Sequence, residues 1–203
     1  YDEKEKVESF FKDLEFGTGG LRGKIGAGPN KMNIYTVGRA TQGLAETIGA
    51  GSKVAIAYDS RNKSDVFAKT AAGVFAANGV KTWLYGELMP TPALSYAVRE
   101  LRCQAGVNIT ASHNPSKYNG YKAYDGEGCQ ITGETADGVM KNIRSTDLFD
   151  GVKLADYDEA LSTGMIEIIP EELIQKFLAR VLEEQVNPGV CQGAGLRLVY
   201  TPL

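Results

Sequence analysis

One short polar loop of this chain holds a hydroxyl nucleophile beside its one histidine. The loop is Thr110-Ala111-Ser112-His113-Asn114-Pro115. The residues before it, 105–109, predict a short strand, and Asn114-Pro115 predicts a turn, because proline fixes its own backbone and biases the preceding residue away from helix. A rigid strand that ends in an exposed turn suits a reactive side chain, so Ser112 is a candidate nucleophile. The alternative is an ordinary turn in which Ser112 and Asn114 bond to backbone groups.

A glycine-rich segment near the N-terminus offers a second kind of chemistry. Residues 17–23 contain four glycines in seven positions, and Arg22 comes just before the last of them. Glycine lets backbone N–H groups approach an anion closely, and arginine presents a planar fork of donors to phosphate. The segment therefore predicts contact with phosphate. A flexible loop is the alternative.

A third segment, Asn119-Gly120-Tyr121-Lys122, follows the serine loop. Asn-Gly is a strong signal for a hairpin turn, so we expect a turn at these two residues. The turn would lead into Lys122, which could then face the same cleft as Ser112. The alternative for Lys122 is a solvated surface charge, the commoner fate of lysine.

Together, the three segments resemble the α-D-phosphohexomutase superfamily, which includes phosphoglucomutases and phosphomannomutases. The superfamily carries Gly-Thr-x-Gly-x-Arg-Gly, Thr-Ala-Ser-His-Asn-Pro and Asn-Gly-[Tyr/Phe/Ile]-Lys, which this chain matches at residues 17–23, 110–115 and 119–122. The Gly-Ala-Gly at 26–28 and the Arg-Ala-Thr-Gln-Gly at 39–43 look like the longer branch of the superfamily. The resemblance runs from about Phe16 to the end of the chain.

The resemblance implies an intramolecular phosphotransferase that acts on sugar phosphates. Ser112 would rest as a phosphoserine, give its phosphoryl group to a sugar monophosphate, and take the other phosphoryl group back from the resulting sugar bisphosphate. Glucose and mannose 1- and 6-phosphates are the expected substrates. The alternatives are a phosphopentomutase, an enzyme that forms glucose 1,6-bisphosphate, and a phosphosugar-binding homologue without catalysis. A serine hydrolase ranks last, because the chain has no Gly-x-Ser-x-Gly elbow.

The resemblance also assigns roles to individual residues. Arg22 is the candidate for touching the transferring phosphate, and Lys122 is the candidate for proton transfer or oxygen stabilisation. His113 can shuttle a proton, but we favour a role in positioning the loop and the phosphate. Asn114 is expected to shape the loop. The catalytic candidates are Ser112, Lys122, His113 and Arg22; the candidates for binding phosphate or substrate are Thr18, Gly19, Arg22, Asn114 and Lys122.

The cofactor implied by the resemblance is Mg²⁺. It would be held by the phosphate on Ser112 and by aspartates of an Asp-Gly-Asp-x-Asp-Arg loop in the next domain, which these 203 residues do not include. Asp59 and Asp125 stay unassigned as metal ligands, because lone aspartates are more often turn residues than metal ligands. Asp59 and Arg61 follow a predicted strand, and we expect this Asp-x-Arg pair to order a loop rather than to perform chemistry.

The bulk properties exclude several other classes of function. The formal net charge of −3 gives no basic footprint for nucleic acid. No apolar run approaches the ~20 residues that a membrane-spanning helix needs. The N-terminal residues show no basic region followed by an apolar core, so we expect no signal peptide in this sequence. The three cysteines, Cys103, Cys129 and Cys191, contain no Cys-x-x-Cys pair, so we expect reduced thiols in a cytoplasmic protein.

The predicted elements alternate as in a three-layer α/β/α sandwich with a mixed, mainly parallel sheet. Asn33 and Ser64 are the expected caps of two of the helices. The interpretation places a phosphohexomutase domain at 1–188, and a linker with the first strand of a second domain at 189–203. The remaining domains of a longer chain are then its expected partners. Predicted strands are 53–58, 80–85, 104–109 and 196–200, with a hairpin at 120–131; predicted helices are 7–14, 33–48, 64–78, 91–99, 132–145 and 170–184.

Overall fold

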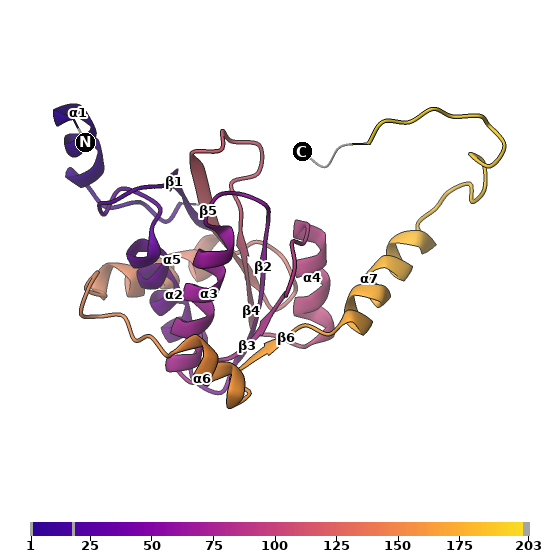
Figure 1. Ribbon diagram of the computed structural model, residues 1–203. Coiled ribbons are helices and arrows are strands. Elements are labelled where there is room, and N and C mark those ends of the chain that lie inside the picture. Colours follow the sequence, from indigo (N-terminus) through magenta and orange to yellow (C-terminus); the bar gives the residue numbers. More distant parts are fainter. Residues whose placement is uncertain (1, 18, 201–203) are drawn as a thin grey trace. The chain divides into compact units, whose positions relative to one another are not determined.

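A six-stranded mixed sheet with helices on both faces forms the fold (Figure 1), which confirms the predicted α/β class. The structure is a computed structural model that describes residues 2–17 and 19–200. It divides into two units, Tyr1–Pro170 and Glu171–Leu203, and the sheet lies in the first. In spatial order, the strands are β1 (Gly20–Lys24), β5 (Tyr118–Asp125), β4 (Ala105–Ile109), β2 (Lys53–Tyr58), β3 (Lys81–Leu84) and β6 (Ile166–Ile168).

The sheet is parallel in one part and antiparallel in the other. Strand β2 runs parallel to β3 and β4, and β6 runs parallel to β3. Strand β5 runs antiparallel to both β4 and β1. Because β2 and β4 are parallel neighbours, the residues that follow their carboxyl ends meet at one edge of the sheet. That edge carries Asp59 after β2 and the serine loop after β4.

Helices cover the two faces of the sheet unequally. Helix α3 (Ser64–Ala77) packs on β2 and β3, with α2 (Ile34–Ile48) and α6 (Tyr157–Ser162) beside it, and α5 (Gly133–Ser145) packs against α2. Helix α4 (Thr91–Glu100) packs on β2 and β4 from the opposite face (Figure 1). Buried on both faces, the middle strands carry fully buried residues such as Val54, Ile56 and Val107.

The predicted cap of α2 is confirmed. The Asn33 side-chain oxygen accepts hydrogen bonds from the backbone N–H groups of Tyr35 (3.1 Å) and Thr36 (3.0 Å). The Thr36 hydroxyl accepts one from the backbone N–H of Asn33 at 3.1 Å, which completes a capping box. The first turn of α2 is therefore fixed by side chains that the sequence already identified.

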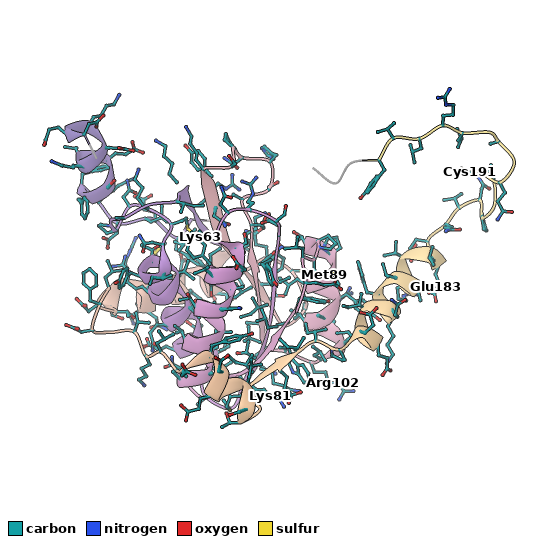
Figure 2. All side chains as sticks on the ribbon, viewed as in Figure 1. Lys63, Lys81, Met89, Arg102, Glu183 and Cys191 are labelled. Carbon is teal, nitrogen blue, oxygen red and sulfur yellow. The ribbon has the colours of Figure 1, made fainter. Side chains whose placement is uncertain are left out.

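The predicted cap of α3 is wrong. Lys63, labelled in Figure 2, occupies the cap position with a φ of 66°, and Ser64 is already the first residue of the helix. The Ser64 hydroxyl instead donates to Asp59 Oδ1 at 3.0 Å and accepts from Asn119 Nδ2 at 2.9 Å. It joins β2, α3 and β5, and long-range bonds of this kind are not visible in a local sequence pattern.

The hairpin turn expected at Asn119-Gly120 is also wrong, because both residues lie inside β5. The expected hairpin at 120–131 is reduced to a single bridge between Tyr124 and Gln130, and β5 takes β4 and β1 as its partners. The N-terminal helix, α1 (Glu3–Phe10), starts earlier than the predicted 7–14, with Asp2 as its cap. No helix among the described residues is long and apolar enough to span a membrane.

The second unit, taken by itself, consists of one helix and an irregular segment. Helix α7 (Glu171–Glu183) agrees with the helix predicted to follow Pro170, and it begins with two glutamates. Residues 196–200, expected as a strand, form none. An isolated strand has no partner for its backbone groups, and the described part of this unit holds no other strand. The domain division at 188 stays a prediction.

Candidate active site

Ser112 stands on an exposed turn just beyond β4, in the loop that leads into β5. Its φ of 55° is in the left-handed region, which costs a residue with a side chain roughly 1–3 kcal/mol unless its surroundings hold it there. The Ser112 hydroxyl lies 3.2 Å from Nδ1 of the exposed His113. The structure thus presents a serine oxygen to solvent with an imidazole beside it, on a backbone held in a defined, strained conformation.

A chain of hydrogen bonds supports this turn from β2. The Thr110 hydroxyl donates to Asp59 Oδ2 at 2.6 Å and accepts from the backbone N–H of Ser112 at 3.0 Å. Asp59 Oδ1 accepts the backbone N–H of Arg61 at 3.0 Å, and the Arg61 Nε lies 3.5 Å from Asp59 Oδ2. The expectation that the Asp-x-Arg pair orders a loop is confirmed, and the loop that it orders is the one that carries Ser112.

Arg22 and Lys122 lie on the same face of the sheet. In the antiparallel register, Arg22 is opposite Gly120, and Gly20 is opposite Lys122. Directly opposed residues project to one face, and residues two apart on a strand share it. Arg22 and Lys122 are therefore diagonal neighbours, roughly 7–8 Å apart at their backbones. Arg22 is exposed and Lys122 is half-buried.

Gly120 is what allows three strands to approach one another at this point. A Cβ atom there would lie 2.6 Å from the Thr110 carbonyl oxygen and 2.8 Å from that of Leu21. The backbone N–H of Thr110 donates to the Gly120 carbonyl at 3.0 Å. The glycine therefore serves a close backbone contact rather than a turn, and it lies between Arg22 on one side and the serine loop on the other.

Asn108 belongs to the same face, although no sequence motif singles it out. It pairs directly with Lys122 across β4 and β5, and it is 1% exposed. Its Nδ2 donates to the Thr91 hydroxyl at 2.7 Å, while its Oδ1 has no hydrogen-bond partner within the described residues. A buried amide oxygen without a partner is costly. It stands beside the one lysine to which the sequence assigns chemistry, and only the strand register reveals this.

The glycine-rich segment packs closely against the protein itself. Gly19 has a φ of 70°, and a Cβ at that position would lie 2.6 Å from the Ile131 carbonyl oxygen. A Cβ at Gly20 would lie 2.2 Å from the carbonyl oxygen of Tyr121. These contacts explain both glycines without a ligand. The phosphate-binding role predicted for Gly19 stays a prediction, and Thr18 lies outside the described residues.

Asn114 takes part in the serine loop through its backbone, and the loop-shaping role expected of its side chain stays a prediction. Its backbone N–H donates to the Ala111 carbonyl at 3.1 Å and closes the turn around Ser112 and His113. Its side-chain Oδ1 is buried and has no hydrogen-bond partner within the described residues. The structure thus brings together Ser112, His113 and Asn114 in one turn, and sets Arg22 and Lys122 on the adjoining sheet face.

The described residues contain no group of three His, Cys, Asp or Glu side chains that could hold a metal ion. The two aspartates that the sequence left unassigned as metal ligands have other partners. Asp59 is bonded as described above, and Asp125 Oδ1 accepts the backbone N–H groups of Glu127 and Cys129, each at 3.0 Å. Both are turn residues, in agreement with the sequence. Within residues 2–17 and 19–200, the side chains therefore form no carboxylate cluster for Mg²⁺, and the metal role of a phosphate on Ser112 stays a prediction.

The three cysteines are free thiols, as the sequence predicted. Cys103 is buried, and its removal from water raises the pKa of the thiol to about 12 against a smaller opposing effect of Lys53. It therefore stays protonated at neutral pH. Cys129 and Cys191 are exposed.

Comparison with known proteins decides the family. Residues 13–149, more than half of the chain, match the family model described as phosphoglucomutase/phosphomannomutase, alpha/beta/alpha domain I. The chain belongs to the α-D-phosphohexomutase superfamily. Within this superfamily it is similar to a protein named probable phosphoribomutase from Schizosaccharomyces pombe, with 38% identity over 94% of this chain and 33% of that protein.

Two further relatives extend the comparison. A phosphoglucomutase of Staphylococcus saprophyticus is 34% identical over 88% of this chain and 33% of its own length. A crystal structure of a phosphoglucomutase/phosphomannomutase family protein from Burkholderia thailandensis has the same fold, with a TM-score of 0.62 over 83% of this chain and 35% of that one, at 24% identity. The chain spans about a third of the length of the curated phosphohexomutases it matches.

Proposed function

We propose that this domain supplies the phosphoserine of a sugar-phosphate mutase, which interconverts the 1- and 6-phosphates of glucose or mannose. The observation that carries the proposal is the geometry of Ser112. Its oxygen is exposed on a braced, left-handed turn, and its backbone N–H is tied through Thr110 to Asp59. Arg22 and Lys122 share the adjoining sheet face. Such an arrangement would supply one site with a phosphoryl carrier and two cationic groups.

The reaction proceeds in two transfers that mirror each other. A hydroxyl oxygen of the sugar monophosphate bonds to the phosphorus on Ser112, the bond between phosphorus and the Ser112 oxygen breaks, and the proton of the sugar hydroxyl ends on Ser112. The resulting sugar bisphosphate turns over in the site. The Ser112 hydroxyl then takes the other phosphoryl group and gives its proton back to the sugar, so atoms and charge balance over the cycle.

The residues around Ser112 divide this work. The guanidinium of Arg22 would neutralise charge on the transferring phosphoryl group, because its planar fork matches phosphate oxygens. Lys122 would hold or move the proton of the attacking hydroxyl. His113, 3.2 Å from the Ser112 oxygen, would position that oxygen and the phosphate. Asn114, with Thr18 and Gly19, completes the proposed set of phosphate ligands.

Mg²⁺, when bound, would neutralise the charge of the phosphate on Ser112. The described residues offer it no carboxylate cluster. We propose that further domains supply the remaining Mg²⁺ ligands. The same holds for the loops that recognise the sugar.

A pentose phosphate is the second candidate substrate. The observation that favours it is the 38% identity to the protein named probable phosphoribomutase, a little above the 34% to the Staphylococcus saprophyticus phosphoglucomutase. The same phosphoserine chemistry would move a phosphoryl group between two hydroxyls of ribose. The chain's own residues act on the phosphoryl group in either case.

The proposal is tested by replacing Ser112 in the full-length protein. We expect Ser112→Ala to lower mutase turnover by ~10³-fold or more, since the proposal makes the Ser112 oxygen the phosphoryl carrier. Ser116→Ala is the matched control, because Ser116 is an exposed serine of the same loop. Turnover should be assayed with glucose 1-phosphate, mannose 1-phosphate and ribose 1-phosphate. Equal activity of the two variants would contradict the proposal. A wild-type protein without activity on any of the three sugar phosphates would instead favour a binding protein.

A further inference from the structure

Arg61 makes an unusual set of contacts for a charged side chain beside a proposed phosphate site. Its Nη1 donates to the backbone carbonyls of Tyr118 at 3.1 Å and Pro115 at 3.3 Å. Its Nη2 donates to the carbonyl of Asn114 at 2.6 Å and to that of Ser112. The side chain is 12% exposed. One guanidinium thus joins four carbonyls of the loop that carries Ser112.

Asp59 forms an ion pair with this guanidinium and also acts on the other side of Ser112. It lies 3.5 Å from the Arg61 Nε, and it accepts the Thr110 hydroxyl, which in turn accepts the backbone N–H of Ser112. Arg61 therefore holds the Ser112 carbonyl while Asp59, through Thr110, holds the Ser112 N–H. The two peptide groups that define the φ of 55° at Ser112 are both fixed from the end of β2.

The contacts of Arg61 also argue against direct binding of phosphate. Both terminal nitrogens point at loop carbonyls, and the Nε faces the carboxylate of Asp59. An arginine that binds phosphate uses its paired N–H groups as a fork toward the anion. The paired N–H groups of Arg61 already donate to backbone carbonyls. Arg22, by contrast, is exposed on the sheet face.

We propose that Arg61 is a positioning residue, which holds the Ser112 oxygen at the angle that phosphoryl transfer requires. The inference rests on the proposed function of Ser112 and goes one step beyond it. A lysine could keep the positive charge but has one nitrogen, so it cannot span four carbonyls at once. Without the guanidinium, Ser112 would relax toward ordinary backbone angles and its oxygen would move. A displacement of about 1 Å at a reacting group can cost ~100-fold in rate.

The test uses Arg61→Lys and Arg61→Met in the full-length protein, with Arg144→Lys and Arg144→Met as matched controls. Arg144 is an exposed arginine on α5. We expect both Arg61 variants to lose kcat by about 10- to 100-fold with KM changed by less than about threefold. Hydrogen exchange of the loop peptide 110–118 should quicken at least ~10-fold, while β2 and β4 keep their protection.

Two results would overturn the inference. One is an Arg61→Lys variant whose kcat and loop exchange match those of Arg144→Lys. The other is a variant that loses thermal stability while its kcat and loop exchange stay unchanged, since that is what a merely structural arginine would do. If Arg61→Met fails to fold, Arg61→Lys carries the same comparison. Should the wild type prove to lack phosphate on Ser112, the proposed function fails, yet the exchange of the loop still decides whether Arg61 holds it.

Discussion

At the scale of residues, the site depends on one serine that is held in a strained backbone conformation. Ser112 has a left-handed backbone, an exposed hydroxyl, and supports on both flanking peptide groups. Residues held in such conformations cluster at functional sites, because the surrounding structure must over-determine them. The sequence named this serine from its motif. It did not show that the supports come from Asp59 and Arg61, since these lie more than fifty residues away along the chain.

Lys122 provides a prediction at this scale. Replacing it by methionine keeps the length of the side chain but removes its nitrogen, so we expect turnover of the full-length protein to fall by ~10²- to 10⁴-fold, the usual contribution of general acid–base catalysis. The substrate's KM should change little if Lys122 acts mainly in the transition state. Steady-state kinetics would measure both.

The matched control for that variant is Lys117→Met. Lys117 is an exposed lysine at the end of the serine loop, and no catalytic role is assigned to it. An equal loss in the two variants would mean that general charge near the loop, rather than Lys122 itself, matters for turnover.

At the scale of elements, the hydrophobic pattern predicted most of the fold. Strand β2 was expected at its observed bounds, and α2 with its Asn33 cap was expected from a single stretch of sequence. These elements follow from local rules, namely burial on both faces and a side chain that caps its own helix. The errors have the opposite cause. Asn119-Gly120 has a high turn propensity, but the two residues lie in β5 because that strand pairs with β4 and β1. A local sequence pattern does not show this long-range pairing.

Gly120 gives a prediction for this sheet. In Gly120→Ala, the new methyl group would meet the carbonyl oxygens of Thr110 and Leu21 at 2.6 and 2.8 Å. We expect the free energy of opening of β4 and β5 to fall by about 1–3 kcal/mol, as in other overpacked cores. Turnover should fall as well, because Thr110 must move. Native-state hydrogen exchange of the β4 and β5 peptides would measure the change.

Gly138→Ala is the control for that experiment. Gly138 lies inside α5, and a Cβ there would meet no atom within 4 Å. Alanine in a helix stabilises it relative to glycine by up to ~1 kcal/mol, so this variant should keep or gain protection. Loss of protection in both variants would contradict the packing explanation.

The N-terminal helix depends on an ion-pair cluster. Glu8 on α1 lies 2.8 Å from the Lys24 Nζ and 3.0 Å from the Lys31 Nζ. Its hydrogen bonds, with Lys24 first and Lys31 second, lower the pKa of the Glu8 carboxyl from 4.5 to about 2. A carboxyl whose pKa is lowered by folding stabilises the fold fully above its ordinary pKa and loses that effect as the pH falls toward its folded pKa.

Glu8→Gln should therefore quicken hydrogen exchange in α1 at pH 7. The difference from the wild type should shrink as the pH falls from about 4.5 to about 2. Glu3→Gln is the control, because Glu3 pairs with Lys6 inside the same exposed helix. An NMR titration of the Glu8 carboxyl carbon checks the pKa directly. A midpoint near 4.5 would show that the lysines do not hold it.

At the scale of the whole molecule, we propose that the described residues form one wall of an active site. The chain spans about a third of the length of its curated relatives, and the described residues offer no cluster of carboxylates for Mg²⁺. We expect the metal aspartates and the sugar-recognition loops in further domains, as the family resemblance implies. No local pattern in these 203 residues can specify which sugar is chosen, because the sugar would contact other parts of the protein.

Residues 1–203 alone should consequently show no mutase turnover. A coupled assay with glucose 1-phosphate, a catalytic amount of glucose 1,6-bisphosphate and Mg²⁺ would measure this, with the full-length protein as the positive control. Circular dichroism must show that the shorter chain is folded. Turnover by the folded domain alone would mean that its own residues complete the site, which would remove the need for further domains.

The measurement that tests the central claim most directly is peptide mass spectrometry of the full-length protein, before and after excess glucose 6-phosphate with Mg²⁺. We predict a phosphate on the peptide that contains Ser112, and its loss once the sugar phosphate is added. Ribose 5-phosphate, tested in parallel, would discharge it if a pentose is the substrate. A Ser112 that carries no phosphate, even after incubation with a sugar bisphosphate, would contradict the phosphoserine account.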